Sequence, residues 1–222
     1  MNCYLVLESD GITLIDTAMG AARIIIEAAR HFGKPIRRIL LTHSHLDHVG
    51  SLDALRSRLP AVQVVAGTRE AQLWAEAARG VKPRNMSLIQ GEPQAPVKGS
   101  FKRLRTPPDM LVAENDVIGS LRVISTPGHT PGHLAFLDER DATLYAGDSL
   151  TTFQELRLPF DPCWYFPFTH TGTWHDETAL SSARKLLSFQ LKRVLSGHGP
   201  QVHEPSAGLR RAIDRAQNKL GS

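Results

Sequence analysis

The first part of the chain alternates between short apolar runs and a longer stretch of helical spacing. Two strand-like runs, residues 3–8 and 12–16, are separated by an Asp-Gly turn, which is a hairpin signal. Over residues 18–32 the apolar positions follow helical spacing, and Gly33 with Pro35 supplies a stop signal. This region therefore predicts a β-hairpin followed by an amphipathic helix.

The same two patterns, short apolar runs and helical spacing of apolar residues, recur along the rest of the chain. Residues 81–110 are the least regular part and are rich in Gly and Pro. Helical spacing predicts helices over residues 49–59, 68–79, 178–189 and 206–220. Short apolar runs predict strands over residues 38–42, 62–66, 121–125, 134–138, 143–146 and 193–195. Hairpins followed by alternating strands and helices fit an α/β fold, with two sheets packed face to face and helices outside.

The composition is that of an ordinary globular protein. Of 222 residues, 41% are hydrophobic and 22% charged, so we expect a single domain spanning residues 1–222. The chain opens without a basic region and long apolar run, and no later stretch has the length of a membrane span. Cys3 and Cys163 are too few for a disulfide framework. We expect a cytoplasmic protein with no membrane partner.

The basic residues do not form a recognisable binding surface. The net charge of +4 would suit an acidic partner, but the lysines and arginines are scattered, and their densest group lies in the Gly/Pro-rich segment at residues 98–105. No aromatic interleaving or recognition motif accompanies that group. We therefore expect no nucleic-acid partner.

Four potential metal ligands are concentrated in the stretch LLTHSHLDHVG, namely His43, His45, Asp47 and His48. Imidazoles and carboxylates are the ligands that borderline divalent metals such as Zn²⁺ take. Alternate side chains of an extended segment point the same way, so His43 and His45 can face one ion. The turn into the following helix brings Asp47 and His48 round to a second ion. One bend can thus supply two neighbouring metals.

Three other stretches place a candidate ligand directly after a predicted strand. VISTPGHTPGH carries His129, LYAGDSL carries Asp148, and VLSGHGP carries His198. Loops at strand ends are where rigid scaffolds place functional groups, so these residues can converge although they are distant in sequence. Together with the four residues of the bend, they suit a two-metal centre.

The joint order of these motifs resembles the metallo-β-lactamase superfamily of αββα hydrolases. T-H-S-H-L-D-H, T-P-G-H-T-P-G-H, A-G-D and G-H-G occur in that order, and the likeness runs from L-I-D-T at residues 14–17 to the last helix. The resemblance implies a four-layer αββα sandwich with two mixed sheets. It also implies a centre of two Zn²⁺ ions, with iron or manganese as other possible metals.

By motif position, the resemblance assigns the seven residues to three roles. The first metal would be held by His43, His45 and His129, the second by Asp47, His48 and His198, and Asp148 would bridge the two. In the family a hydroxide lies between the ions, and Asp47 would orient it for attack.

Further candidates surround this set. The resemblance places Asp16 near the metals, where it could orient a bound imidazole, and stabilisation of a turn is an equally good interpretation. We expect His133 to be a pocket or supporting residue and not a ligand. Tyr165 is similar in type to the active-site tyrosine of the family's lactonases, and His170 or His175 could also touch substrate. Packing on the core is the alternative for each of these loop residues.

The resemblance implies a small hydrolase of the lactonase or glyoxalase II-like type, which cleaves a carboxylic ester, lactone or thioester. Known β-lactamases of this fold are exported and usually carry Cys at the position of Asp148, which disfavours antibiotic hydrolysis. We expect substrate choice to depend on residues 81–110 and 150–176, and a homodimer is possible. An iron-dependent oxidoreductase similar to the sulfur dioxygenases, or a catalytically silent metal-binding protein, remain alternatives.

Overall fold

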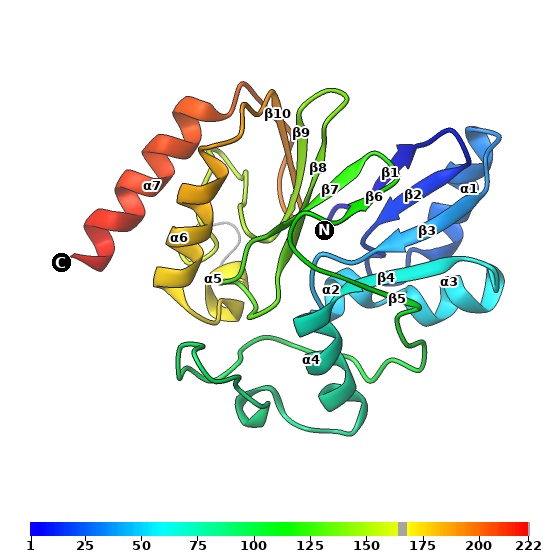
Figure 1. The fold of residues 1–222 in the computed structure, drawn as a ribbon, viewed down its shortest axis with the longest axis horizontal. Helices are drawn as coiled ribbons and strands as arrows, with labels where there is room; N and C mark the ends of the chain where they lie inside the picture. The colour runs from blue at the N-terminus through cyan, green and yellow to red at the C-terminus, as the bar shows by residue number, and fades with distance from the viewer. Residues whose placement is uncertain (164–167, 222) are drawn as a thin grey trace.

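The computed structural model describes residues 1–163 and 168–221, which form two β-sheets (Figure 1). The first sheet has the order β1-β2-β3-β4-β5, with strands at Tyr4–Leu7, Ile12–Ile15, Ile36–Leu40, Gln63–Gly67 and Met110–Val112. The second has the order β11-β10-β9-β8-β7-β6; from β6 to β11 its strands span Val117–Ile118, Leu121–Ser125, Leu134–Asp138, Thr143–Gly147, Arg193–Ser196 and Val202–His203. Both sheets are mixed, because β1 pairs antiparallel with β2 in an otherwise parallel sheet, and β9 and β10 are parallel in an otherwise antiparallel one.

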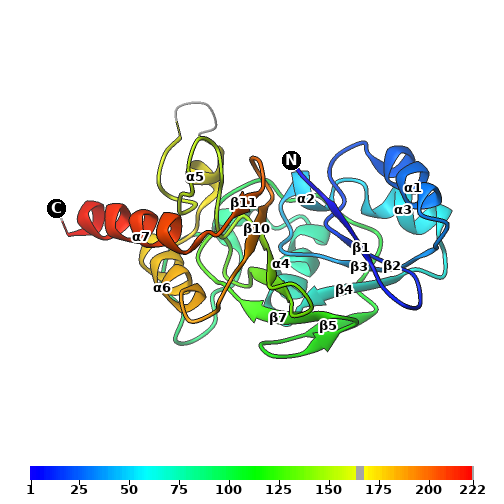
Figure 2. The ribbon, with the colours of Figure 1, turned by 90° about the horizontal axis from the view of Figure 1, so that it is seen from above.

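Helices lie on the outer side of each sheet (Figures 1 and 2). The helices span Ala22–His31 (α1), Leu46–Val49 (α2), Leu52–Arg58 (α3), Thr68–Ala78 (α4), Phe168–Gly172 (α5), Asp176–Leu186 (α6) and Ser206–Leu220 (α7), with a short 3₁₀ turn at Pro83–Asn85. Helices α1 and α3 cover the first sheet, and α6 and α7 cover the second. Within the described ranges, no helix has both the length and the apolar character needed to cross a membrane.

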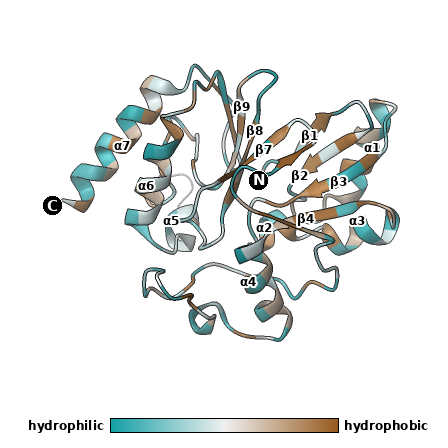
Figure 3. Ribbon diagram, in the orientation of Figure 1, coloured by the Kyte–Doolittle hydropathy of each residue, from teal (hydrophilic) through white to brown (hydrophobic). Residues whose placement is uncertain are grey.

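The apolar core is divided into three main layers by the two sheets. Strand β8 illustrates the division, because its side chains alternate: Leu134 and Phe136 pack between the sheets, whereas Ala135 and Leu137 face α6 and α7. A third layer lies between the first sheet and helices α1 and α3. In Figure 3 the strands are mainly brown, which marks apolar residues, whereas the outer helices carry both apolar and polar residues. The predicted αββα sandwich is therefore confirmed.

Two expected helices have different boundaries in the structure. The helix expected over residues 18–32 begins at Ala22, because Asp16 and Ala18 adopt left-handed backbone angles, with φ of 57° and 51°. The helix expected over residues 49–59 is divided into α2 and α3. Ser51 lies at the division, and its side-chain oxygen accepts a hydrogen bond of 2.9 Å from the Ala21 backbone N–H. Hydrogen bonding to the start of α1 thus competes with a continuous helix.

Strand β3 lies two residues earlier than the expected run 38–42, at Ile36–Leu40. The residues after it still bond to both sheets: the Leu41 N–H donates to the Val65 carbonyl, and the Thr42 carbonyl accepts from the Leu134 N–H. The sequence patterns also missed β5, β6, β11 and α5. These elements are two to five residues long, too short to establish a period.

The packing between the sheets predicts a large cost for truncating Phe136, which is fully buried there. Phe136→Ala should lower the free energy of unfolding by about 3–5 kcal/mol, because it removes apolar contacts and leaves a cavity. Urea denaturation of both proteins measures the difference. Leu111→Ala, at a side chain 51% exposed on β5, should change stability by less than about 0.5 kcal/mol. Equal effects of the two substitutions would contradict the assignment of the core.

Candidate metal centre

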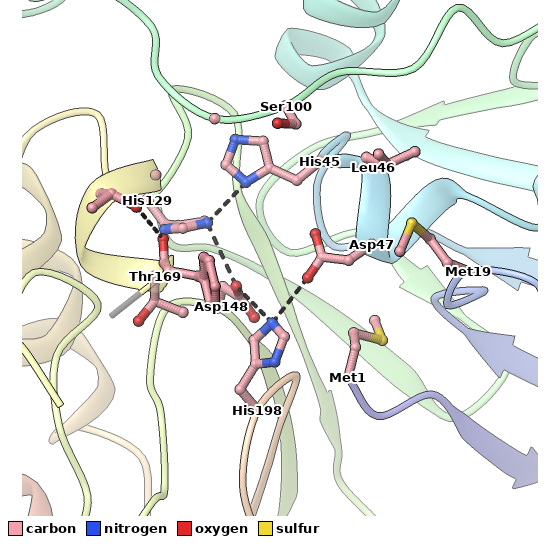
Figure 4. A pocket seen from close by; sticks show the side chains of 14 residues that line it. Met1, Met19, His45, Leu46, Asp47, Ser100, His129, Asp148, Thr169 and His198 are labelled. Carbon is pink, nitrogen blue, oxygen red and sulfur yellow. Dashed lines mark hydrogen bonds and ion pairs between the residues drawn. The ribbon is translucent and has the colours of Figure 1, made fainter. Parts of the chain in front are cut away.

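The seven candidate ligands all lie just beyond the carboxyl ends of strands. The bend with His43, His45, Asp47 and His48 follows β3 and includes α2, while His129 follows β7, Asp148 follows β9 and His198 follows β10. Loops from both sheets therefore meet at one edge of the sandwich. In Figure 4 the labelled ligands, His45, Asp47, His129, Asp148 and His198, point toward a shared space.

Three imidazoles form the first group of ligand atoms. His45 Nδ1 lies 3.1 Å from His43 Nε2 and 3.0 Å from His129 Nε2. All three side chains are buried, and the three nitrogens lie within 4.8 Å of one another. This spacing suits three nitrogen ligands around one cation.

Asp47, His48 and His198 form the second group, and Asp148 lies between the two. Asp47 Oδ2 is 3.1 Å from His198 Nε2 and 3.7 Å from His48 Nε2. The Asp148 carboxylate is 3.2 Å from His48 Nε2 and 3.4 Å from His198 Nε2, and it is also 3.5 Å from His129 Nε2 in the first group. Its two oxygens thus contact both groups, as a bridging ligand requires.

Hydrogen bonds behind the ligands fix the orientation of His43 and His48. The Thr42 hydroxyl donates to Asp16 Oδ2 at 2.8 Å, so its oxygen is available to accept from His43 Nδ1 at 3.1 Å. His48 Nδ1 donates to Asp16 Oδ2 at 2.8 Å. In both rings the Nε2 atom is then the one directed at the cluster.

His45 and His129 are held in the same way. His45 Nε2 donates to the Lys98 carbonyl at 3.0 Å. The Thr173 hydroxyl donates to the Thr169 carbonyl at 2.7 Å, so its oxygen can accept from His129 Nδ1 at 3.1 Å. Each ring therefore presents an unprotonated nitrogen, Nδ1 of His45 and Nε2 of His129, to the first group.

The two groups differ in charge. Burial and the neighbouring imidazoles lower the pKa of His43 and of His129 well below the usual range, so both are neutral at pH 7. Burial is the largest influence on His48 and His198 too and opposes their charge, but Asp148 together with Asp16 at His48, and Asp148 together with Asp47 at His198, outweighs it and raises the pKa of each. Burial likewise opposes charge on Asp148, yet His48 and His198 hold its pKa well below the ordinary value.

The donor set fits a pair of divalent cations. His48 Nε2 and Asp148 Oδ1 are buried and form no hydrogen bond within the described residues, although they lie 3.2 Å apart. The two atoms face each other only as an ion pair, with no hydrogen bond to either from any described residue, and such buried polar atoms are costly, so a cation bound by both would satisfy them. Imidazole nitrogens and carboxylate oxygens are ligands for zinc, iron and manganese, so the residues suit several metals.

Two glycines allow the chain to pass close to the ligands. A Cβ on Gly197 would lie 2.3 Å from Asp148 Oδ1, and a Cβ on Gly99, where φ is +94°, would lie 2.1 Å from His45 Nε2. Any side chain at either position would displace a ligand. Gly197 belongs to the G-H-G motif, whereas no sequence motif indicated that Gly99 approaches the site.

A cavity of about 460 Å³ opens onto both groups. Beside the ligands, its walls consist of apolar, hydroxyl and glycine residues from several loops: Met1, Met19, Leu46, Gly99, Ser100, Phe168, Thr169, Thr171 and Gly172. Sequence reasoning missed these side chains individually. The only available signal was the expectation that residues 81–110 and 150–176 set substrate choice, and each range contributes to the wall.

The other predicted pocket residues lie around the centre in different ways. Asp16 contacts Thr42 and His48 as described, and its backbone is left-handed at the turn after β2. His133 accepts the backbone N–H of Asp148 at 3.0 Å. His170 donates to the Phe160 carbonyl at 2.8 Å and does not line the cavity, and the His175 side chain accepts the Thr178 N–H at the start of α6. Tyr165 lies outside the described residues.

Comparisons with known proteins agree with this geometry. The metallo-β-lactamase superfamily profile matches residues 2–198. The uncharacterized protein YobT of Bacillus subtilis is 42% identical, over 98% of this chain and 91% of its own. Hydroxyacylglutathione hydrolase GloC of Haemophilus influenzae is 23% identical, over 67% and 66%. The crystal structure of TTHA1623 in a di-iron-bound form has 26% identity and a TM-score of 0.65, covering 92% of this chain and 90% of that one.

Because the two groups differ in charge, we expect them to release different numbers of protons when each binds a cation. The pKa of His48 is raised well above the ordinary value, so this ring is protonated at neutral pH, and the raised pKa of His198 favours its protonated form, so a cation at the second group must displace protons. The histidines of the first group have lowered pKa values and release none. Affinity of the second group should therefore fall more steeply as the pH is lowered through 7.

Calorimetric titration of the chelator-treated protein with Zn²⁺, in two buffers of different ionisation enthalpy, counts the protons released. We expect about one to two protons for the equivalent of metal that fills the second group and close to none for the equivalent that fills the first group. Equal proton release for both equivalents would contradict the assigned charge states.

Proposed function

The chain belongs to the metallo-β-lactamase superfamily, and from that membership we propose that it is a dinuclear zinc hydrolase of carboxylic esters, lactones or thioesters. The observation that carries the proposal is the convergence of seven ligand-type side chains into two adjoining groups beside a cavity. In this proposal His43, His45 and His129 hold one Zn²⁺, Asp47, His48 and His198 hold the other, and Asp148 contacts both.

Two bound divalent cations would supply Lewis acidity, making a coordinated water acidic enough to attack near neutral pH and polarising a carbonyl oxygen. The protein's contribution is to hold the ligands and direct the reactants. The Asp47 side chain is 40% exposed at the cavity, unlike the other six ligands, so one carboxylate oxygen can accept a hydrogen bond from the attacking water and orient it. No Ser or Cys nucleophile is required.

The cavity wall supports a small, neutral acyl substrate. Among its described residues there is no lysine or arginine, whereas Met19, Leu46 and Phe168 are apolar and Ser100 and Thr169 carry hydroxyls. Apolar side chains bury an acyl group, and hydroxyls donate hydrogen bonds to it. Apart from the histidines of the ligand set, the described part of this wall offers a phosphodiester or nucleic acid no basic side chain. The likeness to hydroxyacylglutathione hydrolase GloC supports a thioester in particular.

The experiment that tests this function is a hydrolysis screen with the zinc-, manganese- and iron-loaded protein. The panel contains thioesters, lactones, aryl esters, phosphodiesters and β-lactams. We expect turnover of at least one of the first three classes and slower or no turnover of the last two. Hydrolysis confined to phosphodiesters would contradict the proposal.

A second candidate is an iron-dependent oxidoreductase, because a structural relative was solved in a di-iron-bound form. Oxygen consumption by the iron-loaded protein discriminates between the two. An enzyme that consumes oxygen in proportion to substrate would replace the hydrolase proposal. Full metal loading without turnover of any kind would instead indicate a metal-binding protein.

Loss of one ligand should remove most hydrolysis. His43→Ala and Asp148→Ala each take a ligand from the centre, so we expect kcat/KM to fall by at least about a hundredfold. His31→Ala is the matched control, because His31 is an exposed histidine at the end of α1. Steady-state kinetics and metal analysis of the three variants measure the effect. A His43→Ala protein that is as active as the control would contradict the role given to this histidine.

A further inference from the structure

Glu70 is a buried carboxylate outside the ligand set, and hydrolysis as proposed does not use it. It lies in the first turn of α4 and is only 2% exposed. Four donors surround its side chain, and all of them come from the loops that carry the ligands of the first group. A carboxylate with that many buried hydrogen bonds needs a structural reason at this position.

Each carboxylate oxygen of Glu70 accepts hydrogen bonds from a different loop. Oε2 accepts the backbone N–H of Ser44 at 2.9 Å and its hydroxyl at 2.5 Å. Oε1 accepts the hydroxyl of Thr130 and the backbone N–H of Gly132, the latter at 3.1 Å. One side chain thus connects two loops that are more than 80 residues apart, as the His45–His129 separation of 84 shows.

These attachment points lie next to the first group of ligands. Ser44 stands between His43 and His45, and Thr130 directly follows His129. Each loop is therefore bonded to Glu70 at a residue next to a histidine that would bind the metal. The second group has a separate contact, because His48 bonds to Asp16, which also reaches His43 through Thr42, and no hydrogen bond of Glu70 reaches Asp47 among the described contacts.

Helix α4 gives Glu70 a rigid base. Leu73, Trp74 and Ala77 of the same helix are buried. The Thr130–Gly132 turn approaches this helix so closely that a Cβ on Gly132 would lie 2.6 Å from the Glu70 backbone nitrogen. The turn and the helix start are thus packed together as well as hydrogen-bonded.

We propose that Glu70 is a positioning residue that holds the two loops of the first group at metal-binding distance, and thereby sets the metal affinity of that group relative to the second. The proposal rests on the ligand assignment made under the proposed function but not on any substrate. It requires a carboxylate, because Gln would turn an NH₂ group toward the donors of one of the two loops.

Glu70→Gln tests the proposal, and Glu76→Gln is the matched control. Glu76 lies on the same helix, is 8% exposed and accepts one backbone hydrogen bond, from Ser87, away from the ligand loops. Metal-free protein is titrated with Co²⁺, whose visible spectrum reports each site. His43→Ala and His198→Ala provide reference spectra for protein lacking a ligand of the first or the second group.

We expect Glu70→Gln to bind the first-group ion about 10–100-fold more weakly, and to give the spectrum of His43→Ala at limiting Co²⁺. Affinity of the second group should change much less, and Glu76→Gln should match the wild type at both groups. Equal weakening of both groups, or no difference between the two Gln variants, would overturn the proposal. If Glu70→Gln does not fold, Thr130→Val, which removes one donor from one loop, takes its place with the same expectation.

Hydrogen exchange separates this proposal from the ligand assignment. In metal-free protein, the Ser44 and Gly132 amides should exchange faster in Glu70→Gln than in Glu76→Gln, because both donate to Glu70. A wild-type protein that binds no Co²⁺ would refute the ligand assignment and the proposed function. Unchanged exchange in Glu70→Gln would refute the role of Glu70 alone.

Discussion

The crowding of five imidazoles and two carboxylates at one edge of the sandwich is the constraint on which the rest of the structure depends. Their ligand atoms come as close as 3.0 Å, and two of them, His48 Nε2 and Asp148 Oδ1, are buried without a hydrogen bond in the described part of the chain. An unsatisfied buried polar group costs about 1–3 kcal/mol. Binding of cations by these atoms, as proposed, would offset that cost, so the fold would gain from metal what it loses by burying these groups.

The architecture around the cluster restricts its movement. The ligands extend from β3, β7, β9 and β10, whose apolar side chains are packed between and outside the sheets. Two further buried carboxylates bond to the segment from Thr42 to His48: Asp16 bonds to Thr42 and His48, and Glu70 bonds to Ser44. The packed strands and the hydrogen bonds behind the candidate ligands hold them in the geometry that the proposed metal binding requires.

Much of this arrangement could be predicted from sequence, because it depends on local signals. Short apolar runs and helical spacing of apolar residues predicted the strands and helices of the layers. Motifs such as T-H-S-H-L-D-H predicted that candidate ligands directly follow strands. The contacts of Glu70 could not be found in this way. Glu70 lies 26 residues from Ser44 and 60 from Thr130, and a glutamate at the start of a helix is expected at the surface. The short elements β5, β6 and α5 were missed for the different reason that they are too brief to show a period.

Anomalous diffraction from crystals of the zinc-loaded protein tests the central claim most directly. The account predicts two peaks about 3.5–4 Å apart, one among His43, His45 and His129 and the other among Asp47, His48 and His198, with Asp148 contacting both. A single peak shared by both groups, or zinc bound only at other residues, would contradict it.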